Sequence, residues 1–97
     1  MGTQPAQSGY RVSGAGEGGA SVWNGDYIET GTYSSHPYYL KDGSNSHALF
    51  YGGGGWYLCS FMGSPPYYFV SSQDSLPALT GWETILGEEP PPTLSIL

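Results

Sequence analysis

Apolar and polar residues alternate along most of this chain with the two-residue period of a β-strand. The apolar runs are short, rich in tyrosine, tryptophan and phenylalanine, and separated by segments that carry glycine or proline. No window of eleven residues shows the apolar spacing of an amphipathic helix, so we expect almost no helix. The pattern predicts seven strands, at residues 9–13, 26–30, 36–41, 47–51, 56–61, 66–71 and 82–86.

Two glycine-bearing turns indicate how these strands are connected. Asp42-Gly43 and the glycine run at residues 52–55 each lie between two predicted strands. Glycine adopts positive φ angles at no steric cost, and such turns join antiparallel neighbours. We therefore predict an all-β fold, either a small antiparallel meander or a partly open barrel or sandwich, with about six or seven short strands.

The two ends of the chain lack this period and carry proline, glutamine, serine and glutamate. We expect an N-terminal tail at residues 1–8, a β-domain at residues 9–87 and a proline-rich C-terminal tail at residues 88–97. Leu94, Ile96 and Leu97 follow a proline spacer that favours polyproline II, so they are expected to form an apolar hook that reaches a neighbouring subunit. If these residues hold neighbouring subunits together, deletion of residues 90–97 should abolish attachment to the neighbouring subunit without unfolding the domain.

The charge balance excludes two classes of partner. The chain has two basic and eight acidic residues and a net charge of −6, so it cannot neutralise a nucleic-acid backbone or seek an anionic membrane. Cys59 is its only cysteine, which rules out an internal disulfide and favours a reducing compartment. Residues 1–8 lack the basic start and apolar run of a signal peptide, so we expect synthesis in the cytoplasm.

Candidate chemistry in the sequence is sparse. Residues 14–19 spell G-x-G-x-x-G, but no helix follows to hold a pyrophosphate, so we interpret them as a turn and expect no cofactor. His36, His47 and Cys59 fall on three different predicted strands without a metal-binding spacing. Since no acid–base pair or nucleophile can be named either, we expect no metal site, no catalytic residue and no enzymatic activity.

Aromatic residues are the one constellation suited to binding. Three tryptophans, nine tyrosines and three phenylalanines are too many for the core of so small a domain, so some are expected at the surface. Surface tyrosine and tryptophan suit a protein interface or the stacking of sugar rings. The candidates for a partner or glycan interface are Trp23, Tyr38, Tyr39, Trp56, Tyr67, Tyr68, Trp82, Leu94, Ile96 and Leu97.

Between Val12 and Leu94 the chain carries an ordered series of short motifs. They are Val12-Ser13-Gly14-Ala15-Gly16, Asn24-Gly25-Asp26-Tyr27, Gly31, Pro37-Tyr38-Tyr39, Asp42-Gly43, Leu49-Phe50-Tyr51, Gly55-Trp56-Tyr57-Leu58, Tyr67-Tyr68, Ser72, Asp74, Pro77, Gly81-Trp82 and Pro91-Pro92-Thr93. In this order the series resembles an aromatic and glycine-rich β-repeat module found in phage and other viral structural proteins and in large surface proteins. The resemblance implies a non-enzymatic module for display or assembly.

Two hypotheses for function follow. The first is a bacteriophage virion structural or accessory protein, either a capsid decoration (cement) protein or a tail-associated one. Its partners would be viral capsid or tail proteins and other copies of itself, and its location the virion. The second is a carbohydrate-binding surface module that stacks sugar rings on exposed tyrosine and tryptophan, with Asp26, Asp74 or His36 accepting hydrogen bonds from sugar hydroxyls.

Overall fold

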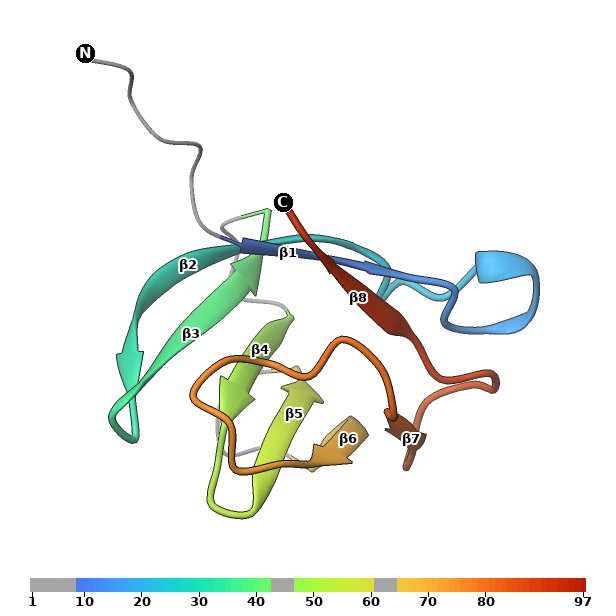
Figure 1. Cartoon of the computed structure of the whole chain (residues 1–97). Helices are drawn as coiled ribbons and strands as arrows, with labels where there is room; N and C mark the ends of the chain where they lie inside the picture. The colour runs from blue at the N-terminus through green and yellow to red at the C-terminus, as the bar shows by residue number, and fades with distance from the viewer. Residues whose placement is uncertain (1–8, 43–46, 61–64) are drawn as a thin grey trace, which may run out of the picture.

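The computed structural model describes residues 9–42, 47–60 and 65–97. These residues form one antiparallel sheet that curls into a half-barrel, in the strand order β7-β6-β5-β4-β3-β2-β1-β8 (Figure 1). The sheet is a meander from β1 to β7, because each strand pairs with the next one in sequence. The strands are β1 (Gly9–Ser13), β2 (Gly25–Tyr33), β3 (His36–Lys41), β4 (Ala48–Tyr51), β5 (Gly55–Cys59), β6 (Pro66–Ser71), β7 (Glu83–Thr84) and β8 (Thr93–Ile96).

This architecture confirms the predicted all-β, partly open barrel, and each of the seven predicted strands has a counterpart among β1 to β7. The only helical element among the described residues is the 3-10 turn η1 (Glu17–Gly19), and no described helix has the length and apolar character needed to cross a membrane. Register shifts in β2, between Glu29 and Gly31, and between β5 and β6, after Leu58, mark bulges. Bulges increase local twist and so help the sheet to curl.

Two tight hairpins set the register of the central strands. Ser34 and Ser35 link β2 to β3 with φ angles of 56° and 65°, the positive pair that a type I′ turn requires. Gly53 and Gly54, with φ angles of 66° and 105°, link β4 to β5, as the glycine run predicted. The predicted Asp42-Gly43 turn lies partly outside the described residues, although Asp42 itself has a positive φ of 49°.

The core lies on the inner face of the curled sheet and is built from rings. Alternate residues of successive strands point into it, so that Trp56, Tyr27 and Tyr68 are fully buried. A smaller cluster packs on the opposite face of β3, β4 and β5, around Phe50 and Cys59. Burying rings in this way removes a large apolar area from water, which stabilises a chain with few charges.

The C-terminal segment corrects the prediction of a free tail at residues 88–97. Residues 93–96 form β8, which pairs with β1 in the register Val12↔Leu94 (Figure 1). Leu94 is only 5% exposed and joins the core, and Pro92 is fully buried. The reason lies in the tertiary structure: β8 pairs with the side of β1 that β2 does not cover, and Leu94 joins the same core cluster as Trp82. Residues 88–97 are therefore part of the β-domain, while the predicted tail at 1–8 lies outside the described residues.

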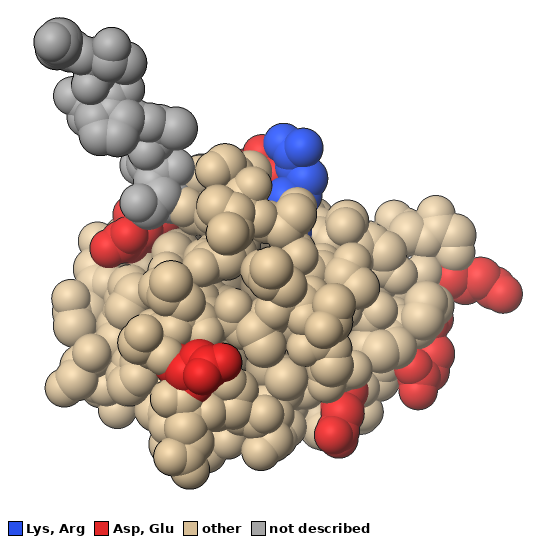
Figure 2. All heavy atoms as spheres, in the orientation of Figure 1, with Lys and Arg blue, Asp and Glu red and all other residues tan. Residues whose placement is uncertain are grey.

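Few charges interrupt the surface. Figure 2 shows a face that is mostly uncharged, with one acidic group within it and others toward its outline. The one ion pair among the described residues joins Arg11 Nε to Asp26 Oδ1 at 2.8 Å, and this contact lowers the pKa of Asp26. Since Arg11 is largely exposed and Asp26 partly exposed, solvent screens this pair and it contributes little to stability.

Candidate binding cavity

The structure places most of the predicted interface residues in the interior. Tyr38 and Tyr67 are half-buried, whereas Ile96 and Leu97 are exposed, by 71% and 37%. The expectation of surface exposure is wrong for the others, because the inner face of the curled sheet encloses their side chains. The buried candidates are Trp23, Tyr39, Trp56, Tyr68, Trp82 and Leu94.

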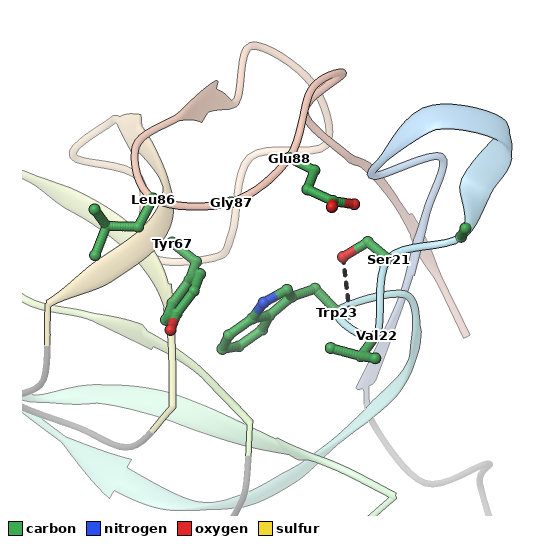
Figure 3. Close-up of a pocket in the computed structure, with 8 residues that line it drawn as sticks. Ser21, Val22, Trp23, Tyr67, Leu86, Gly87 and Glu88 are labelled. Atoms are coloured by element: carbon green, nitrogen blue, oxygen red, sulfur yellow. Dashed lines mark hydrogen bonds between the residues drawn. The ribbon is translucent and has the colours of Figure 1, made fainter.

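Two of the candidates, Trp23 and Tyr67, meet beside an open cavity of about 330 Å³ (Figure 3). Their ring centroids lie 4.8 Å apart, with a tilt of 34° between the planes. The cavity draws on three segments that are distant in sequence: the stretch before β2, the start of β6 and the stretch after β7. Its lining residues are Ala20, Ser21, Val22, Trp23, Tyr67, Leu86, Gly87 and Glu88.

Backbone and side-chain hydrogen bonds hold the first wall. The Trp23 amide donates to Ser21 Oγ at 3.1 Å, and the buried Tyr27 hydroxyl donates to the Trp23 carbonyl at 2.8 Å. The Ser21 amide in turn donates to the Ala15 carbonyl at 3.1 Å. Val22 has no such anchor for its side chain and is 65% exposed at the rim.

Three backbone amides of the opposite wall share one carbonyl acceptor. The amides of Ile85, Leu86 and Gly87 all donate to the Tyr67 carbonyl, at 2.9, 3.2 and 3.1 Å. This arrangement turns the chain after β7 so that Leu86, 59% exposed, and Glu88 stand at the rim. Gly87 allows the close approach, because a Cβ there would lie 2.4 Å from the Tyr68 ring. The wall is therefore set by backbone geometry.

The charges around the cavity are few and of both signs. The Glu88 carboxylate faces the side of the cavity on which Ser21 lies (Figure 3). Lys41 Nζ donates to the Val22 carbonyl behind the same wall. The His47 ring meets Trp23 edge-on at 4.3 Å, and burial, together with the Lys41 charge, lowers the pKa of His47. Both effects favour the neutral imidazole.

The residues predicted to accept hydrogen bonds from sugar hydroxyls lie outside this cavity. His36 stacks on Tyr51 at 3.9 Å, and Asp26 pairs with Arg11. Asp74 receives a hydrogen bond from the Trp56 indole through its backbone carbonyl. None of the three lines the cavity.

The G-x-G-x-x-G segment forms a structural turn. Asn24 Oδ1 accepts from the Ala15 amide at 2.9 Å, and Asn24 Nδ2 donates to the carbonyls of Ala15 and Gly19 at 2.9 and 3.0 Å. The Gly16 amide donates to the Pro90 carbonyl at 3.0 Å, which ties the turn to the C-terminal segment. Within the described ranges, no three His, Cys, Asp or Glu side chains gather as a metal site would require.

Sequence reasoning missed Val22, Leu86 and Glu88 as cavity residues. Each is unremarkable in its own segment, since Val22 and Leu86 are single apolar residues beside turns and Glu88 sits in an acidic, proline-rich stretch. They stand out as candidate binding residues only because the fold brings all three to one cavity. Comparisons of the chain with protein-family models, with curated proteins and with solved structures give no match.

Proposed function

We propose that this chain is a non-catalytic structural protein that acts by packing against other protein subunits. Its setting would be a bacteriophage particle, as a capsid decoration or tail-associated protein. The phage setting rests on the sequence resemblance described above. The observation that carries the packing function is the open edge of the sheet at β8.

The two edge strands of the sheet, β7 and β8, differ in length and in charge. β7 is two residues long and carries the exposed carboxylate of Glu83, and natural proteins use short, charged edges to prevent further pairing. β8 is twice as long and has no charged residue. Ile96 on this strand is 71% exposed. Apart from the one outward hydrogen bond from the Leu94 amide to the Leu79 carbonyl, the β8 edge lacks the features that protect β7.

β8 is also held rigidly enough to receive a partner. The Leu97 amide donates inward to the Gly9 carbonyl at 3.1 Å, and the Leu94 amide donates outward to the Leu79 carbonyl at 2.8 Å. Because amides alternate along a strand, the Ser95 amide faces β1 and the Ile96 amide faces away from it. Within the part of the chain that the structure describes, no strand pairs with β8 on that outer side.

A strand added at this edge would extend the sheet by main-chain hydrogen bonds, a common mode of protein recognition. Each copy offers one such edge, so two copies can pair β8 to β8 about a twofold axis and remove both open edges. The net charge of −6 opposes close contact between copies, which makes a shared sheet across a small uncharged edge the favourable geometry. We therefore expect a homo-oligomer that also contacts capsid or tail proteins.

A matched pair of proline substitutions tests the edge. Ile96→Pro removes the outward amide donor and leaves the bonds between β1 and β8 intact, because an edge strand tolerates proline where its amide faces outward. Ser95→Pro removes an inward donor and should lower the melting temperature. Sedimentation velocity should show an oligomer for the natural chain and a folded monomer for Ile96→Pro. A monomeric natural chain, or an unchanged oligomer in Ile96→Pro, would overturn the role of β8.

The phage setting has its own test. The protein should co-sediment with intact particles of the virus whose genome encodes it, and an electron microscopy map should show its position on the head or tail. Its absence from purified particles would refute the setting, whatever the oligomeric state.

A further inference from the structure

We propose that the cavity beside Trp23 is a binding site for a neutral pyranose sugar. No residue of this cavity belongs to β8, so the proposal is independent of the assembly edge. Three features of the cavity carry it: a hydrogen-bond donor, a carboxylate acceptor and apolar walls.

The donor is the indole N–H of Trp23. The other two indoles donate to backbone carbonyls, Trp56 to Asp74 at 3.2 Å and Trp82 to Ala78 at 2.9 Å. Among the described residues, none accepts a hydrogen bond from the Trp23 indole, and no buried side-chain nitrogen or oxygen there lacks a partner, so this N–H is reached from the open cavity. Figure 3 shows its nitrogen on the edge of the ring that faces Gly87 and Glu88. A ligand that brings an acceptor to this wall would satisfy this donor.

The acceptor is the carboxylate of Glu88. It stands on the same side of the cavity as the Trp23 nitrogen, and Ser21 Oγ lies below it (Figure 3). Ser21 Oγ already accepts a hydrogen bond from the Trp23 amide, so its own proton remains for a ligand. The two cations of the chain are engaged elsewhere, Arg11 with Asp26 and Lys41 with the Val22 carbonyl.

The charges select a neutral ligand. An anion would face the Glu88 carboxylate and the net charge of −6. A cation would face the positive edge of the Trp23 ring, with the Lys41 ammonium close behind Val22. A neutral hydroxyl avoids both conflicts, because it donates to the carboxylate and accepts from the indole.

The geometry of the wall distinguishes a sugar from a peptide. The N–H and C=O of a trans amide point in opposite directions, so one amide cannot serve a donor and an acceptor on the same wall. Neighbouring hydroxyls of a pyranose project side by side and can do so. The C–H face of the ring would then pack on Tyr67, with Val22 and Leu86 at its sides. The volume of about 330 Å³ lies at the small end of ligand sites, as one sugar ring requires.

The test is a titration of the isotopically labelled full chain, followed by the three indole N–H resonances in an NMR spectrum. The Trp23 resonance is assigned through its proximity to Tyr67 and His47. Glucose, galactose, mannose and N-acetylglucosamine are the probes. At least one should shift the Trp23 resonance saturably and leave those of Trp56 and Trp82 in place.

Variants and competing probes make the result decisive. Glu88→Gln keeps the hydrogen bonds between the Glu88 backbone and the Tyr68 hydroxyl and removes only the charge, so it should weaken sugar binding about tenfold or more. Glu83→Gln, an exposed carboxylate outside the cavity, is the matched control and should bind normally. The proposal is overturned if no sugar shifts Trp23, if Glu88→Gln binds as well as the natural chain, or if only N-acetylalanine methylamide or arginine methylamide is bound.

Discussion

Replacement of Leu94 by alanine should destabilise the whole domain, because this residue closes the core from the last strand. Leu94 is 5% exposed and packs in the cluster that includes Trp82, and its amide is bonded to the Leu79 carbonyl at 2.8 Å. The substitution removes three buried carbons, worth about 0.8 kcal/mol each, and leaves a cavity that adds to the loss. We expect the free energy of unfolding to fall by about 3 kcal/mol, a large part of the 5 to 15 kcal/mol typical of a domain.

Thermal and urea unfolding, followed by tryptophan fluorescence, measure this loss. For a domain of this size the melting temperature should fall by roughly 10 to 25 °C. Ile96→Ala is the matched control, since Ile96 lies on the same strand with its side chain 71% exposed and should cost much less than 1 kcal/mol, about the scale of an ordinary surface substitution. Equal stabilities for Leu94→Ala and Ile96→Ala would show that β8 is a detachable tail and would refute the reasoning.

Three further predictions concern the turns and the buried rings. Ser35→Gly should stabilise the chain by about 0.5 to 1 kcal/mol in urea unfolding, since Ser35 holds a φ of 65° that glycine adopts freely, and a loss of stability would argue against a type I′ turn. Asn24→Ala should cost about 1 to 3 kcal/mol because the side chain makes three hydrogen bonds, and Asn24→Asp, which keeps only the acceptor, should fall in between. Burial raises the pKa of Tyr27 and Tyr39 above the ordinary 10.0, so their contribution to stability is complete below that pH and is lost as the pH rises beyond it. Tyrosinate absorbance should therefore appear together with unfolding, and ionisation of all tyrosines in a folded chain would contradict this.

The strands of the meander could be predicted because their signals are local. β1 and β3 begin and end at the predicted residues, since alternation and flanking turn residues are both present in the segment itself. β8 was missed for the opposite reason. Thr93–Ile96 follows three prolines and has no hairpin turn to a neighbour, because its partner β1 lies at the other end of the sequence. Nothing within the segment indicates that pairing.

The candidate cavity likewise combines residues that the sequence indicates with residues that only the tertiary structure brings there. Trp23 and Tyr67 were selected from composition alone, and the fold does bring them together. Their neighbours Leu86 and Glu88 reach the cavity only because three amides converge on the Tyr67 carbonyl, a contact between distant segments. The same curvature buries Trp56 and Trp82, which composition could not separate from Trp23.

The amino-acid sequence by itself determined that this chain forms short antiparallel strands joined by tight turns, with rings as the main apolar groups and no basic surface for nucleic acid. These properties follow from period, turn chemistry and net charge, each of which is readable within a few residues or by counting. Only the tertiary structure decided which rings are buried, that Leu94 completes the core, and that Trp23 and Glu88 share a cavity. Those outcomes depend on the curl of the sheet and on the pairing of β1 with β8, which bring together residues far apart in the chain.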